Sequence, residues 1–234
     1  MKTALTPLLS DKRLRIASDN TSSAPSGAFL SSAAEFPANN RQEVKLCSGI
    51  RELDKLFGGG LSFGTVLETG IPFGNGGRRL LAQFIASATS GASDAPKHWC
   101  LWISARQRPR VYPPAWQALG IDLSRLRFAW SESPVADLKA VFLDDLFRVI
   151  VIDHPRFLKP EESVFLAQSA RQHQKIIMIA RDCPLSAKDS NTAARFRFNI
   201  QRPPGSNVLE IVPIRGLHQS ARITPILNLP NINL

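Results

Sequence analysis

The sequence predicts an α/β fold, with a mainly parallel central sheet flanked by helices and with antiparallel strands at its C-terminal edge. Between about residue 46 and residue 181, short apolar segments typical of strands alternate with amphipathic segments typical of helices. Such alternation implies parallel strands joined by right-handed crossovers. After Arg181 the helical segments stop, and three strand-like segments follow one another. We therefore expect these last three strands to be antiparallel edge strands.

The first half of this region begins with a helix and continues with two strand-helix units. The first helix is expected over residues 48–60, with Ser48 as its cap and Gly58 as its end. The elements that follow it are a strand at 64–71, a helix at 78–90, a strand at 98–104 and a helix at 112–121. The strand at 98–104 is apolar at nearly every position, which indicates that both of its faces are covered.

The second half repeats the alternation and then ends in the three edge strands. The expected alternating elements are a strand at 126–132, a helix at 135–146, a strand at 147–155, a helix at 160–174 and a strand at 175–181. The edge strands are expected at 194–202, 207–216 and 221–228. In the first of them Arg195 and Arg197 alternate with Phe196 and Phe198, so that each pair shares one face. We expect core on the phenylalanine side and water on the other, rather than an aromatic and basic platform for nucleic acid.

Composition divides the chain into one domain with appendages. Residues 46–228 form the expected core domain, because 234 residues with 44% hydrophobic content suffice for one good-sized core. Residues 1–16 are a short segment, residues 17–45 have the Ser, Ala, Asn and Pro content of a flexible linker, and residues 229–234 are a tail.

Charge and cysteine content limit the class of protein. A net charge of +10 and a pI near 10.2 suggest a polyanionic partner such as nucleic acid, although a solvated basic surface gives the same totals. The three cysteines lie far apart, so neither a disulfide framework nor a zinc site is indicated. The N-terminal stretch is too poor for a signal peptide, and no apolar run approaches the length of a membrane span. We expect a cytoplasmic protein without a membrane partner.

A glycine-rich loop follows the strand at 64–71, where nucleotide-binding α/β proteins hold phosphate. Its candidate residues are Pro72, Gly74, Gly76, Gly77 and Arg78. The usual pattern, Gly-x-x-x-x-Gly-Lys-Ser/Thr, uses glycine amides for the phosphates, a lysine for charge and a hydroxyl for magnesium. Here Gly77 stands at the lysine position and Arg78 at the hydroxyl position, and anchoring the pattern on Gly70 supplies neither group. We expect no ATP binding of the usual kind.

Asp153 closes the apolar strand at 147–155 and has two interpretations. In phosphate-loop proteins an acidic residue at the end of such a strand holds magnesium, and open α/β sheets place ligands at that edge. An aspartate that only ends a buried strand is the other interpretation. We favour the second, because the loop lacks both the lysine and the hydroxyl.

The order of these parts resembles the core of the RecA recombinase family over residues 46 to about 228. Its most specific pieces are Gly-Gly-Gly-Leu at 58–61 and Leu-Gly-Ile-Asp at 119–122. The resemblance implies a RecA-like fold. It also places Arg106 where the family has its water-activating glutamate and Arg181 where it has its nucleotide-sensing glutamine. Because arginine stays protonated near neutral pH, it cannot act as a base. We expect a degenerate core that is not an enzyme and takes no cofactor.

Within this superfamily the chain resembles the ImuA type in its size, its altered glycine loop and its basic C-terminal region. The resemblance implies an adaptor in SOS-induced translesion synthesis and DNA repair. The implied partners are RecA, an ImuB-type polymerase homologue, an error-prone DNA polymerase and DNA. Two alternatives stay open, a SulA-like inhibitor of cell division that acts on FtsZ and a weak nucleotide-binding switch or ATPase.

Basic residues gather after the ends of several expected strands, where they could contact nucleic acid or a partner. They are Arg79, Arg106, Arg108, Arg110, Arg181, Arg195, Arg197 and Arg202. If the loops that carry Arg78, Arg79, Arg106, Arg108 and Arg110 share one edge of the sheet, these five residues form a cationic rim that binds DNA phosphates or an acidic surface. The alternative is a set of solvated loops. The four tryptophans are expected to pack in the protein, and no catalytic group or metal site is expected, because the histidines are scattered and Ser104 has no paired base.

Overall fold

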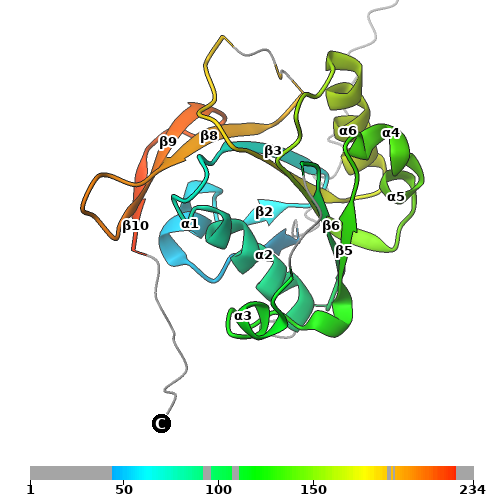
Figure 1. Cartoon of the computed structure of the whole chain (residues 1–234), viewed down its shortest axis with the longest axis horizontal. Helices are drawn as coiled ribbons and strands as arrows, with labels where there is room; N and C mark the ends of the chain where they lie inside the picture. Colours follow the sequence, from blue (N-terminus) through cyan, green and yellow to red (C-terminus); the bar gives the residue numbers. More distant parts are fainter. Residues whose placement is uncertain (1–43, 92–95, 107–110, 189–190, 192, 225–234) are drawn as a thin grey trace, which may run out of the picture. The chain divides into compact units, whose positions relative to one another are not determined.

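The computed structural model describes residues 44–91, 96–106, 111–188, 191 and 193–224. Within these residues the centre is an eight-stranded sheet in the order β10-β9-β8-β3-β7-β6-β4-β5 (Figure 1). Its strands are β3 (Thr65–Gly70), β4 (Trp99–Ser104), β5 (Leu126–Trp130), β6 (Phe147–Asp153), β7 (Ile176–Arg181), β8 (Phe196–Gln201), β9 (Leu209–Arg215) and β10 (Ala221–Ile223). A short antiparallel pair, β1 (Lys45–Leu46) and β2 (Leu61–Ser62), stands apart from it.

The sheet is mainly parallel, as the alternation of segments predicted. Strands β3, β7, β6, β4 and β5 pair in parallel, whereas β9 pairs antiparallel with β8 and β10 with β9. The predicted fold class is confirmed. The expectation for β8 was wrong in one respect, because β8 lies inside the sheet and pairs in parallel with β3. Only β9 and β10 form the antiparallel edge.

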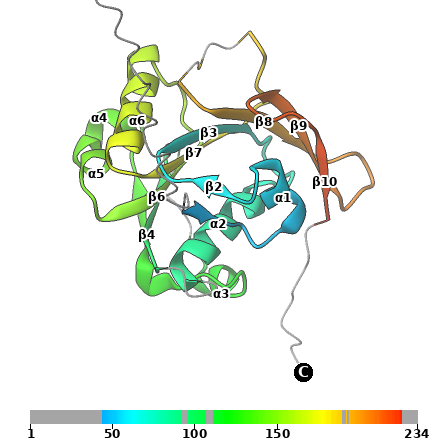
Figure 2. The same cartoon turned by 180° about the vertical axis from the view of Figure 1, so that it is seen from behind.

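Helices cover both faces of the sheet (Figure 1 and Figure 2). The helices α1 (Arg51–Leu56), α2 (Arg78–Ser90) and α3 (Pro113–Gln117) pack on one face, and α4 (Pro134–Asp137), α5 (Lys139–Leu143) and α6 (Pro160–Gln172) pack on the other. A short 3-10 helix, Leu123–Arg125, leads into β5. No helix within the described residues is both long enough and apolar enough to cross a membrane.

Two cores lie on the two faces, which explains the continuous apolar runs in the sequence. In β6, Val149 and Val151 point into the core under α2, while Ile150 and Ile152 point into the core under α6. All four side chains are fully buried. A strand that is covered on both faces has no solvent side, so the period-two alternation disappears.

Local contacts set the ends of the elements and differ in places from expectation. The helix α1 begins later than predicted, because the Asp54 carboxylate accepts the amides of Ser48 and Gly49 and holds this segment as a turn. The helix expected at 135–146 is two short helices that break at Leu138.

The segment 1–16, the tail 229–234 and most of the predicted linker lie outside the described residues. So does the end of the expected core domain, residues 225–228. The last residue of the predicted linker, Lys45, belongs to β1.

Candidate functional site

The glycine loop joins the carboxyl end of β3 to the start of α2 and is held in place by Asn75. The Asn75 side-chain oxygen accepts the Gly77 amide at 2.8 Å, and its side-chain nitrogen donates to the Ile200 carbonyl of β8 at 2.7 Å. Gly74 and Gly76 have positive φ angles of 83° and 79°, which glycine adopts readily. The sequence drew attention to the glycines, but the side chain that organises them is the asparagine between them.

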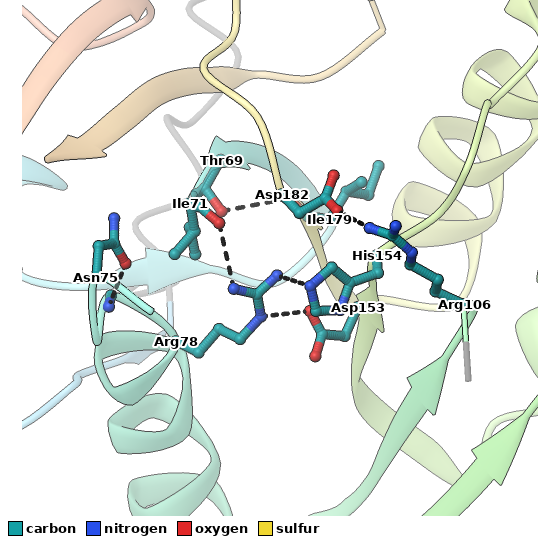
Figure 3. Close-up of polar contacts among 10 residues, drawn as sticks. Thr69, Ile71, Asn75, Arg78, Arg106, Asp153, His154, Ile179 and Asp182 are labelled. Carbon is teal, nitrogen blue, oxygen red and sulfur yellow. Dashed lines mark hydrogen bonds and ion pairs between the residues drawn. The ribbon is translucent and has the colours of Figure 1, made fainter. Parts of the chain in front are cut away.

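Arg78 is the first residue of α2 and points back across the loop toward β6 (Figure 3). Its Nε donates to Asp153 Oδ1 at 2.7 Å, and its Nη1 donates to the Ile71 carbonyl at 3.2 Å. Its Nη2 lies 2.6 Å from His154 Nε2. One guanidinium therefore connects the end of β3, the start of α2 and the end of β6.

The contact with Arg78 determines which ring nitrogen of His154 accepts a hydrogen bond. A guanidinium only donates, so His154 Nε2 must accept and must carry no proton. The proton then resides on Nδ1, which lies 3.3 Å from Asp153 Oδ1. Burial by itself would raise the pKa of Asp153, but the hydrogen bond from His154 and the charge of Arg78 outweigh burial and lower it. Asp153 is thus held as a carboxylate. Neither interpretation from the sequence named its partner, which is Arg78, a cation of the chain itself.

A cavity of about 400 Å³ lies beside this cluster, at the carboxyl edge of the sheet. The loops that follow four neighbouring strands line it with Ala105, Arg106, Glu132, His154, Pro155, Arg156 and Asp182. Arg106 forms an ion pair with Asp182 across it (Figure 3). The predicted cationic rim is therefore a mixed surface here, because carboxylates accompany its arginines.

The other predicted basic residues are spread over several places. Arg79 lies on the first turn of α2, and Arg202 approaches the loop closely, since a Cβ on Gly76 would lie 2.8 Å from its Nη2. Arg195 places its guanidinium over the Phe196 ring. Arg108 and Arg110 lie outside the described residues.

Arg181 and Arg197 meet at a buried carboxylate that the sequence did not reveal. Glu68 of β3 is 2% exposed and accepts Arg181 Nε at 2.9 Å and Arg197 Nε at 3.0 Å. The prediction that the Arg197 face of β8 meets water was wrong, because β8 is an interior strand with both faces covered. The phenylalanine face is buried as predicted, with Phe196 and Phe198 packed around Phe57.

Large apolar side chains are exposed at the carboxyl edge. Phe73, in the glycine loop, is 78% exposed and its ring lies 6.0 Å from that of His154. Phe157, in the loop after β6, is 72% exposed, and Trp130, the last residue of β5, is 41% exposed. Packing accounts for Trp102 and Trp116, which contact each other edge to face, but the expectation of a packed Trp130 was wrong. An edge strand covers its last side chain poorly, which is the physical reason for the difference.

Comparison with solved structures finds the RadB recombinase, which is 15% identical in sequence and aligns with a TM-score of 0.58. The alignment covers 76% of this chain and 94% of that chain. No family model and no curated protein matches the sequence. At this identity the likeness shows the fold alone, and the fold is RecA-like, as the sequence predicted.

The same likeness overturns the expectation of a degenerate core that is not an enzyme. The solved structure with this fold is a recombinase, and a shared fold gives no ground for degeneracy. The likeness favours none of the roles considered from the sequence, neither the adaptor of the ImuA type, nor the division inhibitor, nor the nucleotide switch.

Proposed function

We propose that the chain is a RecA-like adaptor of damage-induced translesion synthesis, which links an ImuB-type polymerase homologue and RecA at damaged DNA. The observation that supports an adaptor is the group of exposed apolar side chains Phe73, Trp130 and Phe157, which we call the carboxyl-edge surface. Soluble proteins rarely expose several large apolar side chains together unless a partner covers them. Aromatic residues are also enriched where proteins bind one another.

Position strengthens this interpretation of the carboxyl-edge surface. The three side chains follow β3, β5 and β6, which are parallel, so their loops meet at one edge of the sheet. The cavity at the same edge, lined by the loops after β4, β5, β6 and β7, offers both arginine and carboxylate groups, through Arg106, Arg156, Glu132 and Asp182. Exposed apolar side chains accompanied by polar groups of both signs are typical of a protein interface, since a nucleic acid would favour cations alone.

The test uses the full chain immobilised on a support. RecA and the ImuB-type homologue, both purified from the cells that make this protein, are passed over it, and the amount of each that is captured is measured. Phe73→Asp combined with Phe157→Asp should weaken capture of at least one of them by about tenfold or more, since exposed aromatic anchors dominate such interfaces. Leu146→Asp is the matched control, because Leu146 is 50% exposed and directly precedes β6, at the opposite edge of the sheet. If the wild type, the double variant and the control capture RecA and the ImuB-type homologue equally, the support for this function is removed.

A nucleotide switch is the second candidate, favoured by two guanidinium groups beside the glycine loop. Arg78 begins α2, whose N-terminus attracts anions, and Arg202 lies against Gly76. A phosphate would have to draw Arg78 from Asp153, so binding and a change in this cluster would occur together. Titration with ATP and magnesium decides the matter, because a ligand present at 100 times its Kd raises stability by about 2.7 kcal/mol. An unchanged melting temperature would exclude the switch.

A further inference from the structure

A second charged surface lies at the opposite edge of the sheet, where the parallel strands begin. Lys97 and His98 precede β4, Arg125 and Arg127 flank the start of β5, and Arg148 is the second residue of β6. Because these three strands are neighbours and parallel, their first residues meet at one edge. We call Lys97, Arg125, Arg127 and Arg148 the amino-edge cluster.

The four cations of the amino-edge cluster form no ion pair within the described part of the chain. No ion pair joins any of its four members to a described carboxylate, whereas Arg78, Arg106 and Arg181 each have one. Two nearby carboxylates attract cluster members without forming an ion pair with them: Asp122 also accepts hydrogen bonds from Ser124, and Asp145 also contacts His173. The pKa of His98 is lowered by burial and also by the charges of Arg148 and Arg125. A titratable group at the centre of the cluster therefore experiences its positive potential.

Aromatic rings hold these guanidinium groups in place. The Arg127 guanidinium lies 4.5 Å from the centre of the Trp99 ring, and its Nη1 donates to the carbonyls of Ser124 and Leu126 at 3.1 Å each. Arg125 approaches the same ring at 6.0 Å. Since both bonds of Arg127 use Nη1, its Nε and Nη2 are the groups left to meet an anion. A guanidinium fixed in this way loses little entropy on binding a phosphate.

Arg148 reaches the cluster through an irregularity in β6. Trp99 is paired with Phe147 and Cys100 with Val149, so Arg148 is an extra residue between the two pairs. Such a bulge turns a side chain out of the regular alternation. Arg148 places its guanidinium 5.2 Å from the Phe63 ring, and its buried Nε has no hydrogen-bond partner among the described residues. The Nε is closed to solvent, so only the terminal nitrogens of this guanidinium are left to meet an anion.

We propose that the amino-edge cluster binds the phosphate backbone of DNA. Its four cations, two of them on a shared aromatic ring, match a row of singly charged acceptors, and planar guanidinium groups bind phosphate in a bidentate manner. The choice of DNA among polyanions rests on the function proposed above. Protein contacts at the carboxyl edge and DNA contacts at the amino edge would then leave both partners bound at once.

Anisotropy of a labelled oligothymidine strand, titrated with the full chain at several salt concentrations, tests the proposal. The variant Arg125→Gln/Arg127→Gln should bind at least about tenfold more weakly, and loss of two phosphate contacts should reduce the slope of log K against log salt by about 1.4. The control Lys55→Gln/Arg222→Gln removes the same charge beside α1 and β10, at the far end of the strand order from β5. It should bind as the wild type does. An RNA strand of the same length shows whether the cluster distinguishes the two nucleic acids.

Two outcomes would overturn the proposal. One is equal loss of affinity in the variant and in the control, which would mean that net charge alone is responsible. The other is tight binding of a polyglutamate peptide without binding of DNA, which would indicate an acidic protein segment as the partner. Neither outcome bears on capture of the protein partners, which depends on Phe73 and Phe157. Failure of the DNA proposal can therefore be told apart from failure of the adaptor function.

Discussion

Arg78 is the residue at which the glycine loop and the end of β6 are joined. Its side chain is 21% exposed and that of Asp153 is 11% exposed, so their ion pair is largely shielded from water. In a setting of low dielectric constant, removal of one partner leaves the other charge without compensation. The main effect of the pair on stability is therefore the free-energy cost of leaving one of the two charges unpaired when the other is removed.

Replacement of Arg78 measures this contribution. Arg78→Met keeps much of the side-chain volume but leaves Asp153 with only His154, so the free energy of unfolding should fall by about 2–3 kcal/mol. Arg171→Met, on the exposed side of α6, should change it by less than about 0.5 kcal/mol. Urea denaturation of the three proteins provides the comparison. Equal midpoints would contradict the assigned role of Arg78.

The lowered pKa of Asp153 predicts how stability depends on pH. A carboxyl whose pKa is lower in the folded state stabilises the protein above its unfolded pKa, near about 4, and that stability is lost as the pH falls through the folded value. Below about pH 4, the free energy of unfolding of the wild type should therefore fall more steeply than that of Arg78→Met. The difference in free energy of unfolding between the two proteins should become smaller as the pH falls. Denaturation midpoints over this range provide the measurement. A constant difference would show that the charge of Arg78 does not act on Asp153.

Sequence reasoning reached the members of this cluster but not their contact. Arg78 and Asp153 were both identified, one from the loop pattern and the other from the end of a buried strand. Their ion pair depends on where a long flexible side chain points, and residues 75 positions apart give no local pattern for it. Glu68 and the contact of Asn75 with Ile200 were missed for the same reason, since these partners are distant in sequence.

At the scale of elements, the buried charges of Glu68, Arg181 and Arg197 tie three neighbouring strands together. They lie on β3, β7 and β8, the centre of the sheet. Glu68 is 2% exposed, and the Arg197 side chain is 4% exposed. The sequence predicted the strands well because they are continuous apolar runs. It placed β8 at the edge wrongly, because a parallel pairing with β3 requires contacts between residues that are about 130 positions apart.

Neutralising Glu68 should destabilise the sheet strongly. Glu68→Gln removes the negative charge that two largely buried guanidinium groups share, so the free energy of unfolding should fall by about 3–5 kcal/mol. Glu210→Gln is the matched control, because Glu210 pairs at 3.6 Å with an Arg222 side chain that is 78% exposed. That exposed pair should contribute less than about 1 kcal/mol. A similar fall in the free energy of unfolding in both variants would contradict the claim that burial makes the Glu68 ion pairs more important than the exposed pair.

Two glycines of the loop differ in what they require. A Cβ on Gly77 would lie 2.8 Å from Ile200 and 2.9 Å from Ile71, whereas a Cβ on Gly74 would meet nothing within 4 Å. Gly74→Ala is disfavoured only by its positive φ, at about 1 kcal/mol. Gly77→Ala should lower the melting temperature more, because it pushes the start of α2 away from β8. If Gly74→Ala lowers the melting temperature more than Gly77→Ala does, the side chains around Gly77 can move aside at little cost.

At the scale of the whole molecule, the parallel sheet separates two surfaces of different chemistry. The carboxyl-edge surface is apolar with a border of both charges, and the amino-edge cluster is cationic. Composition alone indicated a basic protein and could not say where the charge lies. The sequence pointed to the carboxyl edge for the cations, yet ion pairs compensate Arg78 and Arg106 there. Which cations are left uncompensated depends on the tertiary structure.

The most direct test of two independent surfaces is retention of labelled DNA by the chain when it is held on an immobilised partner protein. The wild type should retain DNA on the ImuB-type homologue. The Arg125→Gln/Arg127→Gln variant should bind the partner but release DNA, and Phe73→Asp/Phe157→Asp should bind DNA in solution but not the partner. Displacement of the partner by DNA, or loss of both activities in either variant, would contradict the separation of the two surfaces.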